Sequence, residues 1–305
     1  MKYLRRLPKS IAGCAVTIGT FDGLHRGHRK VIQELRRQAK ILRSPGLMLT
    51  FSFPPRQILN NGKLNILLTG DEKLALLRSL GLDIVVSLAF GPQLSRLSAE
   101  DFFRKIIVER LRAKTVVVGY NFAFGYQRQG GISLLRKLGK KCQVKIKIVS
   151  PVKRGREIVS STLIRRLLRE NKVEKAAEYL GYNYNFGGRV IRGRQRGREL
   201  GFPTANILLP LNKIIPSGVF AAEVRVGEKF YPSVVNIGFR PTFGREKEIL
   251  AEAHIFNFFG SLYRRKIRIF VLRRLREEKN FSSSDQLKQQ INQDIEQAKN
   301  FFKQR

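Results

Sequence analysis

Two histidines, His25 and His28, are the residues with the clearest potential for chemistry in this sequence. They lie in a stretch punctuated by Gly19, Gly23 and Gly27, which can let the backbone approach a phosphate closely. An apolar run precedes the stretch and predicts a buried strand over 14–18, and the spacing of apolar residues after it predicts a helix. A helix N-terminus offers free N–H groups and a favourable dipole to anions. The pattern therefore predicts an anion site at a strand-to-helix turn.

The alternatives for this pair of histidines are a metal site and ordinary surface residues. Zinc is disfavoured because the chain has three histidines and no nearby cysteine or carboxylate cluster to complete a ligand set. The order of residues, with Phe21 and Asp22 before the pair, resembles the H-x-G-H signature of the nucleotidyltransferase superfamily. That resemblance implies that the histidines stabilise charge on the α-phosphate of a nucleoside triphosphate.

A second stretch, residues 188–206, is rich in glycine and arginine and ends in L-G-F-P-T-A-N. Gly193 and Gly197 could form a phosphate cradle, although no G-K-[ST] ends the stretch as in a Walker loop. In an extended chain Thr204 and Asn206 point the same way, and their oxygens suit Mg²⁺. The alternative is a basic surface hairpin.

Two further stretches lie near the carboxyl ends of predicted strands. The loop 119–131 carries Asn121 and Phe124 and could share a ligand site with the histidine turn. The alternative interpretation is a structural loop filled by aromatic side chains. Ser161, Thr162 and Arg165 mark a helix start at which hydroxyls and a cation suit a triphosphate. Many helices begin in this way without a ligand.

The elements that must position these residues fall into two kinds. Strands over 14–18, 46–51, 84–88, 114–119 and 143–149 alternate with helices, which predicts a parallel sheet covered on both faces, with ligands beyond the carboxyl ends of its strands. A linker is expected at 181–188. Strands over 221–226, 230–235, 251–258 and 266–272 then predict a small antiparallel barrel, and a last helix capped by Ser283, Ser284 or Asp285 should pack against it.

The composition limits the class of protein. At 305 residues the chain can form two domains, and it lacks a long uncharged apolar run, so no membrane span is expected. The basic N-terminus lacks an apolar signal core, and two cysteines do not make a disulfide framework, so we expect a cytoplasmic location. The net charge of +36 attracts polyanions, but the basic residues are spread along the chain, so no specific nucleic-acid partner is expected.

Three stretches together resemble the adenylyltransferase module of bacterial bifunctional riboflavin kinase/FAD synthetase: G-x-F-D-G-x-H-x-G-H at 19–28, G-x-N-F-x-F-G at 119–125 and S-S-T-x-I-R at 160–165. The resemblance implies an α/β nucleotidyltransferase, Rossmann-like N-terminal domain. It implies nucleotide or phosphate contacts from the glycine-rich turn, Ser161, Thr162 and Arg165, and flavin contacts from Asn121 and Phe124. One departure is Pro54, which stands where the family usually has a histidine.

The second half resembles the riboflavin kinase module of the same family, through L-G-F-P-T-A-N at 200–206, V-N-I-G-F-R-P-T-F at 235–243 and L-R-E-E-K-N-F at 275–281. This resemblance implies that Glu252 is the general base, that Thr204 and Asn206 hold Mg²⁺ and ATP, and that Asn236 and Arg276 contact flavin. A strand carboxylate that faces the barrel mouth could accept the proton, but from the residues alone the favoured interpretation of Glu252 is an ordinary strand carboxylate. A departure is the stretch 257–264, which lacks the acidic residues usual in the family and should form a loop near the base.

The resemblance covers nearly the whole chain and implies an enzyme with an adenylyltransferase domain over 1–182 and a kinase domain over 183–305. Riboflavin would be phosphorylated to FMN and FMN adenylylated to FAD, with ATP as co-substrate and Mg²⁺ as cofactor, in a monomer or weak homo-oligomer. The alternatives are a riboflavin kinase with a weakened N-terminal domain, because of Pro54, and a basic nucleic-acid-binding protein on a nucleotide-binding fold.

Overall fold

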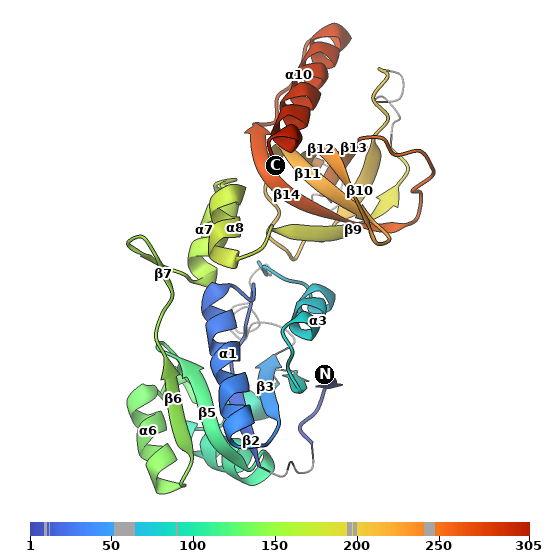
Figure 1. The fold of residues 1–305 in the computed structure, drawn as a ribbon. Helices are drawn as coiled ribbons and strands as arrows, with labels where there is room; N and C mark the ends of the chain where they lie inside the picture. The colour runs from blue at the N-terminus through green and yellow to red at the C-terminus, as the bar shows by residue number, and fades with distance from the viewer. Residues whose placement is uncertain are drawn as a thin grey trace. The chain divides into compact units, whose positions relative to one another are not determined.

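The computed structural model describes residues 1–8, 11, 13–51, 65–89, 91–193, 197, 200–240 and 248–305, with only the backbone of residues 239 and 240. The chain forms two compact units, Met1–Ser161 and Thr162–Arg305, each coloured along its length in Figure 1. Among the described residues, no helix has the length and apolar character that crossing a membrane requires.

The first unit is built on a six-stranded sheet with the spatial order β1-β4-β3-β2-β5-β6. All of its strand pairs are parallel, which confirms the predicted α/β class. The short edge strand β1 was not predicted, because three residues are too few to show a period. The strands are β1 (Lys2–Leu4), β2 (Cys14–Ile18), β3 (Gly46–Phe51), β4 (Ile84–Leu88), β5 (Ala113–Gly119) and β6 (Lys145–Val149).

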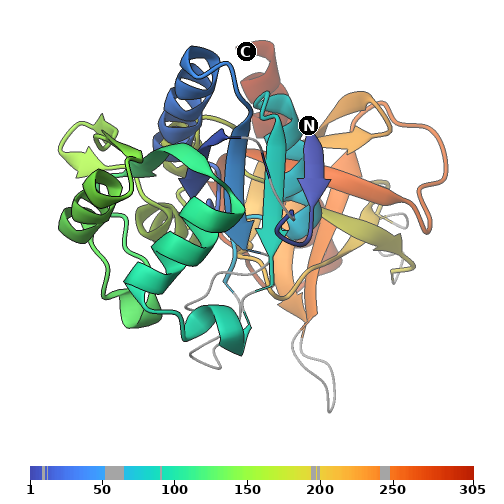
Figure 2. The same ribbon diagram turned by 90° about the horizontal axis from the view of Figure 1, so that it is seen from below.

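Helices cover both faces of this sheet, as predicted. Val16 and Leu47 enter one apolar core, whereas their neighbours Ala15 and Met48 enter the other, since side chains alternate along a strand. Helix α1 lies along one face in Figure 1, and Figure 2 shows the sheet from below. The helices are α1 (Arg26–Ile41), α3 (Gly70–Ser79), α4 (Pro92–Ser95), α5 (Ala99–Asp101), η1 (Phe102–Arg110), η2 (Tyr126–Arg128) and α6 (Ile132–Lys141); a hairpin, β7 (Lys153–Arg154) and β8 (Glu157–Ile158), follows β6.

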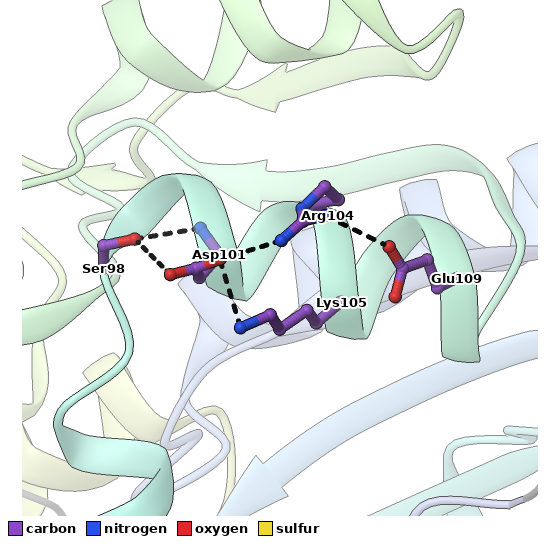
Figure 3. Close-up of polar contacts among 5 residues, drawn as sticks. All are labelled: Ser98, Asp101, Arg104, Lys105 and Glu109. Carbon is purple, nitrogen blue, oxygen red and sulfur yellow. Dashed lines mark hydrogen bonds and ion pairs between the residues drawn. The ribbon is translucent and has the colours of Figure 1, made fainter.

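The helix predicted from Ser98 onward is present, but its main part, η1, is a π-helix. Ser98 caps its start, and the Asp101 carboxylate pairs with Arg104 and Lys105 on the exposed face (Figure 3). These pairs lower the pKa of Asp101, chiefly through the Arg104 hydrogen bond. The predicted inward residues are all buried; they are Phe102, Phe103, Ile106, Ile107 and Leu111. Their spacing of four and five residues suits the wider π-helical turn.

The second unit contains two short helices and a closed antiparallel barrel with the order β10-β13-β12-β11-β14-β9. Its interior is apolar: Phe186, Ile207, Phe220 and Ala251 are fully buried. The elements are α7 (Ser161–Arg169), which begins at the end of the first unit, α8 (Val173–Leu180), β9 (Asn185–Ile191), β10 (Ala205–Leu209), β11 (Gly218–Val226), β12 (Lys229–Arg240), β13 (Glu248–Ile255), β14 (Lys266–Arg276) and α10 (Ser284–Lys303).

The last helix packs on the outside of the barrel, as predicted. Ser283 accepts a hydrogen bond from the Gln286 N–H and so is the N-cap. Ile295 and Ala298 of α10 pack against Val219 and Val234. These two strand residues therefore belong to the outer face of β11 and β12, opposite the residues that fill the barrel.

Three details of the predicted second half are wrong. The linker was placed at 181–188, but Tyr184 is fully buried, its hydroxyl donates to the Ile214 carbonyl at 2.6 Å, and β9 begins at Asn185. Strands β9 and β10 were not predicted, because glycine and arginine obscure the first and the second is short. Strand β13 ends at Ile255 instead of continuing to residue 258. The compact units divide at Ser161, and the proposed domain boundary after Tyr182 stays a prediction.

Candidate active sites

The histidine pair lies where the sequence predicted it, at the turn between β2 and α1. His25 is the N-cap of α1, and its Nδ1 accepts a hydrogen bond from the His28 N–H at 3.3 Å. Because Nδ1 is an acceptor, a neutral His25 ring carries its proton on Nε2. The two rings stack with centroids 3.6 Å apart, so both present their edges to the same place.

Glycines bring the backbone of the turn close to its aromatic rings. A Cβ on Gly27 would lie 3.1 Å from the His25 ring, and a Cβ on Gly19 would lie 3.2 Å from the Phe21 ring. Gly23 has φ +87°, a conformation that L side chains rarely adopt. Phe21 in turn packs edge-on against His28, with ring centroids 5.2 Å apart. The glycines and Phe21 thus shape the turn around the histidines.

The Asp22 carboxylate is hydrogen-bonded to backbone N–H groups of another loop. It accepts hydrogen bonds from the Leu67 N–H at 3.0 Å and the Leu68 N–H at 3.2 Å, so it ties a second loop to the histidine turn. The Asp22 carbonyl accepts a hydrogen bond from the Ser161 hydroxyl at 2.8 Å, which fixes the start of α7 there. These hydrogen bonds hold the loop at Leu67 and the start of α7 against the histidine turn.

Lys73 is a further member of this site that was not predicted from the sequence. Its Nζ donates to the Thr20 carbonyl and to the Thr50 hydroxyl, both at 2.6 Å, and so links the turn to the end of β3. Burial lowers the Lys73 pKa to about 8, and the nearby Asp22 carboxylate partly opposes this. The position on an amphipathic helix gave no signal, since lysine there is ordinarily exposed.

In the barrel, three predicted site residues form one row across adjacent strands. Asn206 of β10 and Asn236 of β12 are both direct register partners of Glu252 on β13. Directly paired residues in antiparallel strands lie on the same face with Cα atoms about 4.5–5.5 Å apart. The row continues to Val219, which packs against α10, so it lies on the outer face of the barrel. Glu252 was expected at the barrel mouth, and the structure places it on this outer face.

Gly193 and Gly197 lie against the other predicted ligands. A Cβ on Gly193 would overlap the side-chain amide of Asn206, which is 8% exposed, and a Cβ on Gly197 would lie 3.1 Å from the Thr204 hydroxyl. The backbone at these two glycines therefore lies close to the side chains of Thr204 and Asn206. One hydroxyl and one amide oxygen are hard donors, and Mg²⁺ is usually held by few protein ligands together with substrate phosphates, so these residues fit such an ion.

Both halves of the chain match models of known families. Residues 7–163 match FAD synthetase, and residues 180–302 match riboflavin kinase. A bifunctional riboflavin kinase/FMN adenylyltransferase from Buchnera aphidicola subsp. Schizaphis graminum is 38% identical over 99% of each chain. The corresponding protein of Escherichia coli K12 is 36% identical over 95% of this chain and 93% of its own. This chain belongs to that family.

One solved structure resembles the whole chain. A crystal structure described as a macrolide-efflux protein from Streptococcus pneumoniae has a TM-score of 0.89 and 28% identity, and the match covers 98% of this chain and 99% of that one. The efflux function in that description is said of the Streptococcus pneumoniae protein and is not transferred to this chain. For this chain, the family assignment rests on the family models and on the sequence relatives.

The other residues that the family resemblance indicated in the first half lie on segments other than the histidine turn. Asn121 is exposed in the loop after β5. Phe124 is 6% exposed, stacks on Phe122 with centroids 5.5 Å apart, and joins the core that contains Phe102, which is the geometry of the structural alternative. Thr162 and Arg165 follow Ser161 on α7, in the second compact unit. Pro54 lies outside the described residues.

Arg276, predicted to contact flavin, has its guanidinium occupied by protein groups. Nε and Nη2 donate to the buried Asp294 carboxylate at 2.8 Å, and Nη1 donates to the Glu277 carbonyl at 2.8 Å. This bidentate pair ties the end of β14 to α10. His254 was not predicted to have a role; its Nδ1 lies 3.0 Å from the Pro203 carbonyl, next to Thr204. Only the pairing of β10 with β13 brings it there.

Proposed function

We propose that this chain carries out both reactions of its family. The barrel unit phosphorylates riboflavin with ATP to give FMN, and the parallel-sheet unit transfers AMP from ATP to FMN to give FAD and pyrophosphate. The cross-strand row of Asn206, Glu252 and Asn236 carries the proposal for the kinase, because it puts a carboxylate between two amides beside a backbone cradle.

For the kinase step, Glu252 accepts the proton of the riboflavin terminal hydroxyl as the hydroxyl oxygen attacks the γ-phosphorus of ATP, and the bond from that phosphorus to the β,γ-bridging oxygen breaks to release ADP. Phosphoryl transfer otherwise needs positioning and charge stabilisation. Gly193 and Gly197 let backbone approach the phosphates, and Thr204 and Asn206 would hold Mg²⁺. The ion would neutralise charge on the phosphate oxygens. Asn236 lies on the flavin side of the base.

For the adenylyl step, the edges of His25 and His28 face the α-phosphate, where negative charge grows as an FMN phosphate oxygen attacks and pyrophosphate leaves. Donors fixed before the reaction stabilise that charge without reorganising. Ser161, Thr162 and Arg165 would contact phosphate, and Asn121 would lie near the nucleotide or flavin. A cytoplasmic location, a domain boundary at 182/183 and a monomer or weak homo-oligomer complete the proposal.

One assay tests the proposal: purified full-length protein is incubated with riboflavin, ATP and Mg²⁺, and FMN and FAD are separated by chromatography. FMN followed by FAD is expected. FMN alone would support the alternative of a riboflavin kinase whose first domain has weakened. If neither FMN nor FAD is formed, the assignment is refuted.

A further inference from the structure

The side-chain amide of Asn236 has one satisfied end and one unsatisfied end. Asn236 donates a hydrogen bond to the Glu278 carboxylate. A carboxylate only accepts hydrogen bonds, so the NH₂ group must face Glu278 and Oδ1 must face elsewhere. Oδ1 is buried and has no partner among the residues that the structure describes. A buried acceptor without a donor is costly, so this orientation suggests that a ligand supplies the donor.

Gly238 makes the space that Glu278 occupies. It lies two residues after Asn236 on β12, so the two share a face of the strand. A Cβ on Gly238 would overlap Oε1 of Glu278, and the backbone of Gly238 is not in the left-handed region. Space for the carboxylate, and not backbone conformation, is therefore the reason for glycine at this position.

The loop that carries Glu278 is fixed at its start. Arg276 is bound to Asp294 of α10 and also donates to the Glu277 carbonyl, and its guanidinium carbon lies 5.8 Å from the centre of the Phe281 ring. The neighbouring Glu277 differs: its side chain is 80% exposed and pairs with Arg274. Glu278 is thus directed at β12, although the residue as a whole is exposed.

The Glu278 carboxylate is also close to the proposed base. Burial raises the Glu278 pKa, and the Glu252 carboxylate adds to this effect. Asn236 is the direct register partner of Glu252. A donor that reaches Asn236 Oδ1 would therefore lie next to the group that Glu252 deprotonates. In riboflavin the neighbours of the reacting hydroxyl are the other ribityl hydroxyls.

We infer that Glu278 is a positioning residue for riboflavin: it orients Asn236 so that Oδ1 accepts a hydrogen bond from a ribityl hydroxyl. This inference rests on the kinase activity proposed above. Glu278 itself contacts neither the reacting oxygen nor the phosphates. Its effect should therefore appear in riboflavin binding and not in ATP binding.

The test is steady-state FMN formation by the full chain, with riboflavin and ATP varied separately. Glu278→Ala should raise KM for riboflavin about 5–10-fold, the loss expected for one hydrogen bond, with KM for ATP unchanged. Gly238→Ala should do the same, because its Cβ displaces the carboxylate without altering it. Glu278→Gln keeps an oxygen that can accept from Asn236 and should restore most of the affinity. In an Asn236→Ala background, neither Glu278→Ala nor Gly238→Ala should add a further effect.

Glu277→Ala is the matched control and should leave both KM values at the wild-type level. Thermal melting checks that each variant folds, and Gly238→Ala and Glu278→Ala serve as independent tests if one of them does not. The inference is overturned if both leave KM for riboflavin unchanged, if their effects add to that of Asn236→Ala, or if Glu278→Gln behaves like Glu278→Ala. Loss of FMN formation by the wild type would instead refute the proposed kinase activity.

Discussion

The two candidate sites of this chain are built in different ways. The histidine site is a turn: its two rings belong to one stretch of ten residues, and helix α1 fixes their spacing. The barrel site is a row: Asn206, Glu252 and Asn236 come from three strands, and only the register of the barrel brings them together. A turn can be recognised from contiguous sequence, whereas a row depends on pairings between distant segments.

The chemistry differs in the same way. The turn offers ring nitrogens and backbone N–H groups, which stabilise developing negative charge. The row offers a carboxylate between amides, which suits proton removal. Substitutions in one site should therefore change one reaction and leave the other unchanged.

The largest effect is expected from Glu252→Gln, which keeps the shape of the side chain and removes its basicity. The single-turnover rate of FMN formation should fall by ~10²–10⁴-fold, with ATP affinity little changed. FAD formation from supplied FMN should continue at the wild-type rate. Equal single-turnover rates in variant and wild type would return Glu252 to the role of an ordinary strand carboxylate.

His28→Ala should give the complementary result. Loss of one preorganised donor typically costs about 10²–10³-fold in rate, so FAD formation should nearly disappear while FMN formation continues. The two products are quantified by chromatography. Gly91→Ala is the control in the same unit, since a Cβ there meets nothing within 4 Å. FAD production at the wild-type rate would remove His28 from the mechanism.

Gly193→Ala tests whether the barrel cradle serves ATP. The added Cβ would displace the Asn206 amide, so KM for ATP in the kinase assay should rise about tenfold, a loss of roughly 1.4 kcal/mol, while KM for riboflavin changes little. Gly187→Ala is the control: it lies on β9, which ends two residues before Gly193, and a Cβ there would make only a 3.4 Å contact. A rise in KM for riboflavin without a rise in KM for ATP would assign this cradle to the flavin.

The last prediction concerns stability at the histidine turn and leaves both reactions aside. The Lys73 pKa is lowered to about 8 in the folded chain, so between pH 8 and 10 the unfolded chain binds more protons there than the folded one. The cost of burying this charge is present below pH 8 and is relieved as pH rises. Calorimetry should therefore show that the free energy of unfolding of the wild type rises, relative to that of Lys73→Met, by on the order of 1–2 kcal/mol over this pH range. Lys140→Met, at an exposed lysine, is the control, and a flat difference would contradict the pKa.

The sequence by itself determined the class of each half and most of the elements of the first. Residues 14–18, 46–51 and 84–88 are apolar runs, each interrupted by a single hydroxyl residue, because both faces of a parallel sheet are covered, so these strands were read with their correct bounds. The histidine turn was equally readable, since a loop and the first turn of a helix are local in sequence. The motifs that resemble the family then indicated the residues of the second candidate site.

The tertiary structure decided what those patterns left open. Strand β9 was missed because its glycines and arginine leave no clear period, and β10 was missed because it is short; closure of the barrel makes both of them strands. The outer-face position of Glu252 follows from the alanines on either side of it filling the barrel. Lys73, His254 and Glu278 gave no signal, because each acts on a segment far away in the sequence. Their partners are set by strand order and register, which no local pattern encodes.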